Sequence, residues 1–260
     1  MEEQTFKYDE VKALSANTFT RAGYTFEGWA VSADGLKVYD DKDNVRNLSA
    51  EDGAIVNLYA KWKANTYTVI FNGNGAGVTG SMANQSFTYD VEQTLIANSF
   101  SRTGYTFDRW NTDANGGGTS YSDGQSVSNL TTEGDIILYA IWKGNIYTVI
   151  LDDEGGEGGS GSISATFGSD LPAVEVPEKT GYEFQGYYDG QNGTGTCYYA
   201  ADGKGVAAWN KASGATLYAY WTPKSFTLTF HAADGTVTPQ DKTVTFGETY
   251  GELPVPVLKG

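Results

Sequence analysis

The chain has 260 residues and carries 32 acidic against 17 basic side chains, which gives a formal net charge of −15. A field of that sign repels phosphate backbones and anionic membrane surfaces, so nucleic acid is excluded as a partner. The 18 Tyr, 12 Phe and 33 Gly, with only 6 Pro, suit short strands joined by glycine turns. No apolar run is long enough to span a bilayer, so we expect no direct membrane insertion by this segment.

The first 64 residues predict a β-rich unit. Phe6-Lys7-Tyr8 alternates as a strand does, and residues 11–19 form either a short helical turn or an extended crossover. In 23–29, read G-Y-T-F-E-G-W, large rings alternate with polar or small residues, which predicts a strand with one aromatic face turned to a core. The leading glycine fits a turn into that strand. Residues 55–62, which end in tryptophan, predict the closing strand.

The same order returns after about 80 residues, which indicates tandem repeats. The aromatic strand recurs as G-Y-T-F-D-R-W at 104–110 and as G-Y-E-F-Q-G-Y at 181–187. Because the rings recur at matched positions, most of them are interpreted as core residues. The complete copy spans 65–144, and its strands are expected at 67–71, 85–89, 105–111 and 136–142.

Four repeats are predicted, and we name them repeats one to four. Repeat one (1–64) is partial because it lacks an opening strand, and repeat two (65–144) is complete. Repeat three (145–223) is complete but divergent, and repeat four (224–260) holds opening strands only. Only Lys63–Thr66 separates the end of repeat one from the opening strand of repeat two. Such short connections are expected to hold neighbouring repeats in a restricted orientation.

The motifs of repeat two follow a fixed order: Tyr-Thr-Val-Ile-Phe with Asn-Gly-Asn-Gly, Phe-Thr-Tyr, Gly-Tyr-Thr-Phe with Trp, Thr-Ser-Tyr with Asp-Gly, Asn-Leu-Thr, and Leu-Tyr-Ala-Ile-Trp. This series resembles the Listeria–Bacteroides repeat, also seen as the B-repeat of internalin-type surface proteins. Arg109 and Tyr187 depart from the pattern set by Gly28 and Trp29. The resemblance implies a mainly β or α+β fold class, with tandem β-grasp-like repeats that clasp a short helix or crossover and form an elongated array. It implies stalks, spacers or adhesive modules of secreted bacterial proteins, and offers no catalytic residue.

The residues that could carry chemistry are few. Cys197 is the single cysteine, which rules out an intrachain disulfide, and His231 is the single histidine. They lie in different repeats, so neither a catalytic pair nor a zinc site is expected, and no cofactor is predicted. Acidic runs at 40–43 and 152–157 lack calcium-loop spacing and are interpreted as solvated loops, so no metal site is predicted. An isopeptide crosslink through Lys61 or Lys143 stays open.

Aromatic residues outside the common pattern gather in 182–209. They are Tyr188, Tyr198, Tyr199 and Trp209. If exposed, they would form a binding site that stacks on a sugar ring or anchors a protein. If buried, they would only repack the core of a divergent repeat, which is the more frequent fate of aromatic residues.

The sequence therefore predicts a non-enzymatic repeat segment of a bacterial cell-surface protein. Its expected role is that of a semi-rigid stalk or spacer with weak adhesion. The alternative is an adhesin module for a host glycan or protein, centred on 182–209. Other expected partners are neighbouring repeats of the same protein. We expect an extracellular location at the bacterial surface, with export signal and anchor outside this segment. An unpaired opening strand in repeat four and a missing one in repeat one also leave pairing between chains open.

Overall fold

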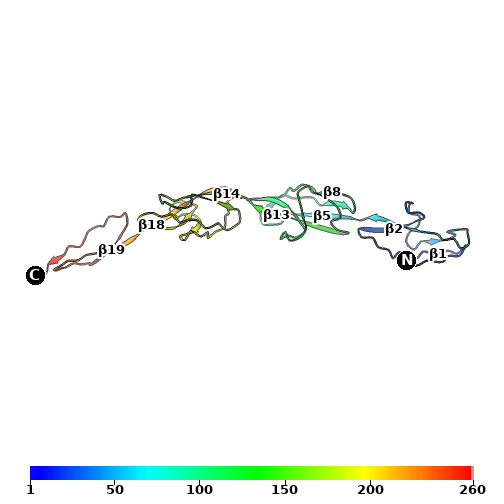
Figure 1. Ribbon diagram of the computed structural model, residues 1–260, viewed down its shortest axis with the longest axis horizontal. Helices are drawn as coiled ribbons and strands as arrows, with labels where there is room; N and C mark the ends of the chain where they lie inside the picture. Colours follow the sequence, from blue (N-terminus) through cyan, green and yellow to red (C-terminus); the bar gives the residue numbers. More distant parts are fainter. Residues whose placement is uncertain (259–260) are drawn as a thin grey trace. The chain divides into compact units, whose positions relative to one another are not determined.

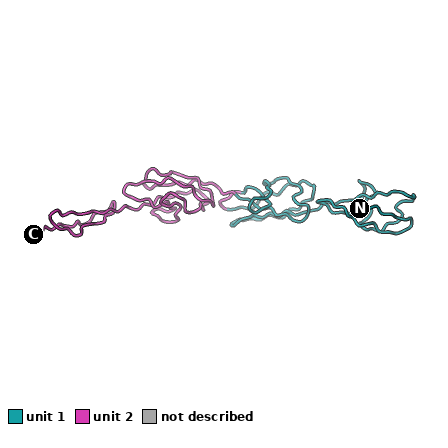
Figure 2. The backbone as a smooth tube through the Cα atoms, turned by 60° about the horizontal axis from the view of Figure 1, so that its bottom comes forward, with its two compact units in different colours: residues 1–102, 107–142 teal, residues 103–106, 143–260 magenta. Residues whose placement is uncertain are grey.

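The computed structural model describes residues 1–258 and is almost entirely β-structure (Figure 1). In that range the one helical element is a 3-10 turn, η1 (Gln191–Gly193), and no helix is long and apolar enough to cross a membrane. The chain forms two compact units (Figure 2). Unit 1 comprises 1–102 and 107–142, and unit 2 comprises 103–106 and 143–260.

Repeat two contains a five-stranded mixed sheet with the order β11-β10-β13-β5-β7. The opening strand β5 pairs parallel with the closing strand β13 and antiparallel with β7. β5 lies inside the sheet, between β13 and β7, which fits its composition, because β-branched and aromatic residues favour strands that are covered on a face. The strands are β5 (Thr66–Asn72), β7 (Gln85–Thr88), β10 (Tyr105–Asn111), β11 (Ser120–Tyr121) and β13 (Asp135–Gly144).

The crossover between β7 and β10 is extended, and the corresponding residues 11–19 of repeat one contain a short strand and no helix, which settles the alternative that the sequence left open. Its strand β8 (Gln93–Thr94) pairs antiparallel with β12 (Ser126–Val127). Its end, β9 (Ser101–Arg102), pairs with β6 (Val78–Thr79). Leu95 between them is 1% exposed and belongs to the core of the repeat. The crossover therefore covers the sheet as an irregular layer tied down by short ladders.

Repeat three has a sheet of the same topology, ordered β15-β14-β18-β16-β17. Its opening strand β14 again runs parallel to the closing strand β18 and antiparallel to the strand that follows it, β15. The register of β16 against β18 shifts between Phe184 and Gly186, which marks a β-bulge. The strands are β14 (Ile146–Asp152), β15 (Ser162–Thr166), β16 (Tyr182–Tyr188), β17 (Cys197–Ala200) and β18 (Ala215–Pro223).

Repeats one and four have smaller sheets within the described residues. In repeat one the aromatic strand pairs with the closing strand, and in repeat four the opening strand forms a hairpin with the next. The strands of repeat one are β1 (Lys12–Ala13), β2 (Tyr24–Ala30), β3 (Asn44–Val45) and β4 (Tyr59–Ala64). Those of repeat four are β19 (Ser225–Thr229), β20 (Gly235–Thr236), β21 (Asp241–Thr245) and β22 (Val257–Leu258).

Candidate inter-repeat interface

The start of each aromatic strand forms a contact with the following repeat. In unit 1, Gly23 adopts a φ of +75°, which glycine allows and other residues resist. A Cβ atom on Gly23 would lie 2.3 Å from the ring of Tyr89, so the ring packs flat against glycine backbone. Tyr24 meets the same ring edge-on, with centroids 5.8 Å apart. The start of the aromatic strand of repeat one therefore packs against an aromatic ring of repeat two.

A single residue, Asn65, connects β4 to β5 and is fixed from both sides. Its N–H donates to the carbonyl of Gly23, and its carbonyl accepts from the N–H of Tyr89, both at 2.9 Å. Its side-chain oxygen accepts a 2.6 Å hydrogen bond from Thr25, and its amide nitrogen donates to the carbonyl of Thr132. The backbone and side-chain groups of Asn65 therefore bond to residues of both repeats and hold them together.

In unit 1, two charged side chains, Asp90 and Arg21, also contact Tyr24. The hydroxyl of Tyr24 donates a 2.6 Å hydrogen bond to Asp90, and Asn129 donates to the other oxygen of the same carboxylate. The bond from Tyr24, followed by that from Asn129, lowers the pKa of Asp90 below its ordinary value. The same bond to Asp90 raises the pKa of Tyr24. The guanidinium of Arg21 stacks 3.7 Å from the centre of the Tyr24 ring.

Unit 2 contains the same arrangement at Gly104, whose φ is +80°. A Cβ atom there would lie 2.5 Å from the ring of Phe167, and Tyr105 meets that ring edge-on at 5.2 Å. The connector is Asn145, which bonds Gly104 and Phe167 through its backbone. Thr106 donates a 2.6 Å hydrogen bond to its side chain, as Thr25 does to Asn65. The aspartate of the first contact is here a glycine, Gly168.

A third contact, also in unit 2, keeps the backbone but changes the side chains. Gly181 has a φ of +83° and would place a Cβ atom 2.3 Å from the ring of Phe246. Tyr182 meets that ring at 5.6 Å. Lys224 is the connector, with backbone bonds to Gly181 and Phe246 at 2.8 and 2.9 Å. We call each of the three sets a glycine–tyrosine clamp, defined by the glycine, the tyrosine after it, the connector and the opposing ring.

The clamps correct one interpretation made from the sequence. Most of the repeated aromatics were interpreted as core residues, and the rings later in each aromatic strand do lie in the cores, but Tyr24, Tyr105 and Tyr182 and the rings opposite them lie at repeat boundaries and belong to no core. The reason is that a strand's first residue projects beyond the core of its own repeat. A signal for this was available, because the glycine before the tyrosine and the short connector recur together at all three boundaries.

The predicted binding aromatics are mostly buried. Trp209 and Tyr199 are 0% exposed and Tyr198 is 1% exposed, all in the core of repeat three. Trp209 packs against Tyr198 at 5.3 Å, and the hydroxyl of Tyr198 donates to Asn210. Burial raises the pKa of Tyr199 to about 12. These three rings offer no face to a ligand.

Tyr188 is the member of the predicted set that reaches the surface, where it is half-buried. Its ring meets that of Tyr220 edge-on at 5.9 Å. Gly193 of η1 approaches the Tyr220 ring closely, since a Cβ atom there would lie 2.8 Å away. The structure thus separates Tyr188 from the three buried rings and groups it with Tyr220.

Aspartate side chains of the two acidic runs accept hydrogen bonds from nearby backbone and side-chain groups. Asp153 accepts a 2.5 Å hydrogen bond from the hydroxyl of Tyr187, and Asp152 accepts one from the N–H of Glu154. Asp41 accepts from the N–H of Asn17. Across residues 1–258, no group of three or more His, Cys, Asp or Glu side chains is arranged to hold a metal ion. Cys197 is half-buried, and its thiol donates to the carbonyl of Tyr199.

The sequence profile of the Listeria–Bacteroides repeat domain matches residues 1–61, 67–141 and 147–220. The chain belongs to this family. The three matched Listeria–Bacteroides repeats begin and end close to the connectors Asn65 and Asn145, so the glycine–tyrosine clamps lie at the boundaries between family units.

Several curated proteins carry similar sequence. Two are from Evansella cellulosilytica: "Putative Gly-rich membrane protein" is 29% identical over 86% of this chain and 25% of its own length, and "Putative membrane protein" is 29% identical over 82% and 29%. Internalin H of Listeria monocytogenes is 33% identical over 48% of this chain and 20% of its own length. The chain therefore spans less than a third of the length of each of these relatives.

Proposed function

We propose that this segment is a non-catalytic spacer of a bacterial surface protein, in which coupled tandem repeats act as a semi-rigid stalk. The observation that carries the proposal is the recurrence of the glycine–tyrosine clamp. It occurs once in unit 1 and twice in unit 2, each time with a one-residue connector. A chain that needed only to link independent domains would be served by a flexible linker and would have no reason to repeat these contacts.

The physical argument concerns rotation about the connector. Turning one repeat against the next would break two backbone hydrogen bonds and one edge-to-face ring contact in unit 1. Each is worth about 0.5–1.5 kcal/mol. Their sum is several times the thermal energy, so a clamp of this kind favours one orientation while still allowing rare opening.

An extracellular location at the bacterial surface belongs to the same proposal. It is supported by the family and by the names of the relatives, which are membrane proteins and an internalin. The net charge of −15 fits a surface-exposed spacer, because like charge keeps such a segment soluble.

Distance measurement between two spin labels tests the spacer directly. The labels are placed at Ala33→Cys and Glu92→Cys, both exposed and both in unit 1, with Cys197→Ser to remove the native thiol. We expect a narrow distance distribution that broadens when Tyr89→Ala is added. Tyr8 occupies the same place in repeat one, at 66% exposure, so Tyr8→Ala is the matched control and should leave the distribution unchanged. A broad distribution in the parent protein would refute the stalk.

We also propose an adhesive role, in which Tyr188 and Tyr220 form the binding surface. A paired, half-exposed aromatic surface is the kind that stacks on a sugar ring or seats a protein side chain. A glycan array and host-cell binding, each with parent protein and Tyr188→Ala, test this role. Binding that survives Tyr188→Ala would remove this surface from consideration.

A further inference from the structure

The outer face of the sheet of repeat three carries a row of side chains that is acidic at one end and aromatic at the other. Asp152 of β14 is paired with Tyr218 of β18, which is paired in turn with Tyr188 of β16. Residues that pair across neighbouring strands point to the same side of a sheet. Their chain neighbours Leu151 and Leu217 are buried in the core, so the row lies on the opposite side of the sheet, toward solvent.

The ring of Tyr188 is held in place from one side. Tyr220, which follows Tyr218 by two residues on β18, meets the ring of Tyr188 edge-on at 5.9 Å. Gly193 of η1 lies close against the ring of Tyr220, so Tyr220 acts mainly as a support for Tyr188. Tyr188 and Tyr218 are half-buried and Asp152 is exposed, so a ligand can reach this row from solvent.

Negative charge dominates repeat three, which has ten acidic and three basic side chains. The lysines already have partners, which are a carboxylate for Lys204 and Lys211 and a backbone carbonyl for Lys179. At the acidic end of the row, Asp152 accepts a hydrogen bond from the N–H of Glu154. The carboxylate of Glu154 accepts one from the amide of Gln191 in η1. Both donors are uncharged, so the negative charge of the two carboxylates is available to a ligand.

The same row in repeat two has neither the carboxylate nor the free ring. Asn72 stands in the place of Asp152. Asn111 stands in the place of Tyr188, is 0% exposed, and bonds through its amide nitrogen to the loop that follows it. Two differences on one row of the same fold therefore supply a carboxylate and a ring. These are the two groups that recognise an ammonium or guanidinium ion.

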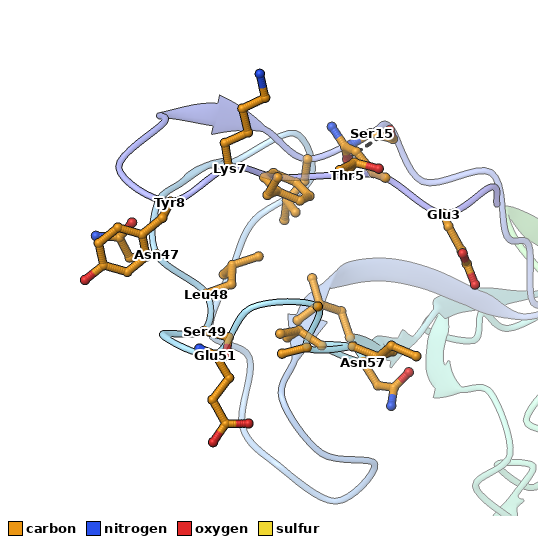
Figure 3. A pocket seen from close by; sticks show the side chains of 18 of the residues that line it. Glu3, Thr5, Lys7, Tyr8, Ser15, Asn47, Leu48, Ser49, Glu51 and Asn57 are labelled. Carbon is orange, nitrogen blue, oxygen red and sulfur yellow. Dashed lines mark hydrogen bonds between the residues drawn. The ribbon is translucent and has the colours of Figure 1, made fainter.

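A groove in repeat one offers a contrast in charge. It has a volume of about 960 Å³ and lies between residues 1–8 and 47–58. Figure 3 shows Lys7 on one wall and Glu51 on the other, so side chains of both signs line it. The groove therefore lacks the one-sided charge that marks the outer face of repeat three.

Tyrosine rings of this chain already contact cationic side chains at two places. The guanidinium of Arg21 lies 3.7 Å from the centre of the Tyr24 ring. The ammonium of Lys179 lies 5.0 Å from the centre of the Tyr182 ring and 5.7 Å from that of Trp221. The contact expected at Tyr188 is thus of a kind that the folded chain uses within itself.

We propose that this outer face binds a basic segment of a partner protein, with one arginine or lysine side chain on the ring of Tyr188 and a second near the carboxylate of Asp152. Neighbouring strands lie about 4.8 Å apart, so the two residues are separated by about 10 Å. Residues three apart in an extended chain are separated by about the same distance. The inference rests on the proposed adhesive role of Tyr188 and Tyr220, and it specifies a cationic ligand.

Binding of two labelled peptides to the full chain tests the proposal. The probes are octaarginine and octacitrulline, which has nearly the same shape without the charge, and fluorescence anisotropy at physiological salt measures their binding. We expect octaarginine to bind roughly tenfold more tightly than octacitrulline. Tyr188→Leu, which keeps apolar cover but removes the ring, should weaken octaarginine binding about tenfold. Tyr188→Phe keeps the ring and should stay within about twofold of the parent protein.

A second pair of variants separates the row from net charge. Asp152→Asn installs the residue of repeat two and should weaken octaarginine binding about two- to fivefold. Glu175→Gln is the matched control, because Glu175 is exposed and follows Val174, which packs on the core side of the sheet. It should bind as the parent does. Equal losses in Asp152→Asn and Glu175→Gln, or equal binding by Tyr188→Leu and Tyr188→Phe, would overturn the proposal.

The glycan array distinguishes a wrong ligand class from a wrong adhesive role. Glycan binding that is lost in Tyr188→Leu, together with no binding of octaarginine, would refute the cationic ligand and leave the adhesive role standing. Binding of neither octaarginine nor any glycan or host cell would refute both. Octaarginine binding that follows the ring and the carboxylate of the row would support both.

Discussion

In repeat two the last ring of the aromatic strand is Trp110, whereas repeat three has Tyr187 at that position. Trp110 is 0% exposed and contacts Phe71 and Phe107 at 4.9 Å. Tyr187 is equally buried but contacts Phe184 and Tyr199, at 5.0 and 6.1 Å. Two cores of one topology are thus filled by different rings. The fold therefore requires that the core be filled, but it does not require one particular ring, as expected from the tolerance of protein cores to apolar substitution.

The first loop residue after the opening strand also differs between repeats two and three: it is Gly73 in one and Asp153 in the other. The indole N–H of Trp142 donates to the carbonyl of Gly73, and that of Trp221 donates to the carbonyl of Asp153, so Gly73 and Asp153 are equivalent. Asp153 is also the partner of the Tyr187 hydroxyl. Burial, then the bond to Asp153, raises the pKa of Tyr187 well above its ordinary value. Repeat three has therefore exchanged a tryptophan and a glycine for a hydrogen-bonded pair.

The largest expected effect comes from Trp110 and Trp209, the fully buried tryptophans of repeats two and three. Trp110→Ala and Trp209→Ala should each cost about 3–5 kcal/mol of unfolding free energy, because both leave a large cavity. Urea unfolding followed by circular dichroism measures this. Trp209 has no aromatic counterpart in the other repeats, so a loss below about 1 kcal/mol would show that repeat three does not depend on its extra ring.

A smaller effect is expected at the β-bulge of repeat three, compared with the same position in repeat two. Gly186 has a φ of +131°, and a Cβ atom there would lie 2.2 Å from the carbonyl oxygen of Tyr199. Gly186→Ala should therefore cost about 2–3 kcal/mol. The corresponding residue in repeat two is Arg109, and Arg109→Ala should stay within about 0.5 kcal/mol. Thermal unfolding of both variants gives the comparison, and equal costs would contradict it.

The exchanged pair can be tested by moving repeat three toward repeat two. Tyr187→Trp alone leaves Asp153 without its partner and should cost about 1–3 kcal/mol. Adding Asp153→Gly should recover part of that loss. A double-mutant cycle from urea unfolding measures the coupling between the two positions. Strictly additive effects would mean that the hydroxyl and the carboxylate do not act as a pair.

The smallest effect concerns pH at the clamps. Because the pKa of Asp90 is lowered, its contribution is present above the ordinary pKa of 3.8 and is lost as pH falls below that value. Because the pKa of Tyr24 is raised from 10.0, its contribution is lost only as pH rises above that value. The label distance between 33 and 92 should therefore broaden in acid and in strong base. Asp90→Asn should remove the acid response, and an unchanged response would assign it elsewhere.

Much of the strand pattern could be predicted from the sequence. The aromatic strand expected at 105–111 is β10 with identical bounds, and the strands expected at 67–71 and 136–142 lie within β5 and β13. Period-two alternation is a local property, so it can be read from a single segment. The mainly β tandem-repeat fold and the family are confirmed.

The repeat, the strands and the family could therefore be predicted without coordinates, because periodicity and motif order are properties of the linear sequence. Which rings are core, which form the clamps and which reach solvent follows from contacts that the folded chain alone provides. Trp209 and Tyr188 looked alike in the sequence, yet one is fully buried and the other half-buried. The physical reason is that burial depends on what the neighbouring strand, crossover or repeat places over a side chain, and those neighbours are distant in sequence.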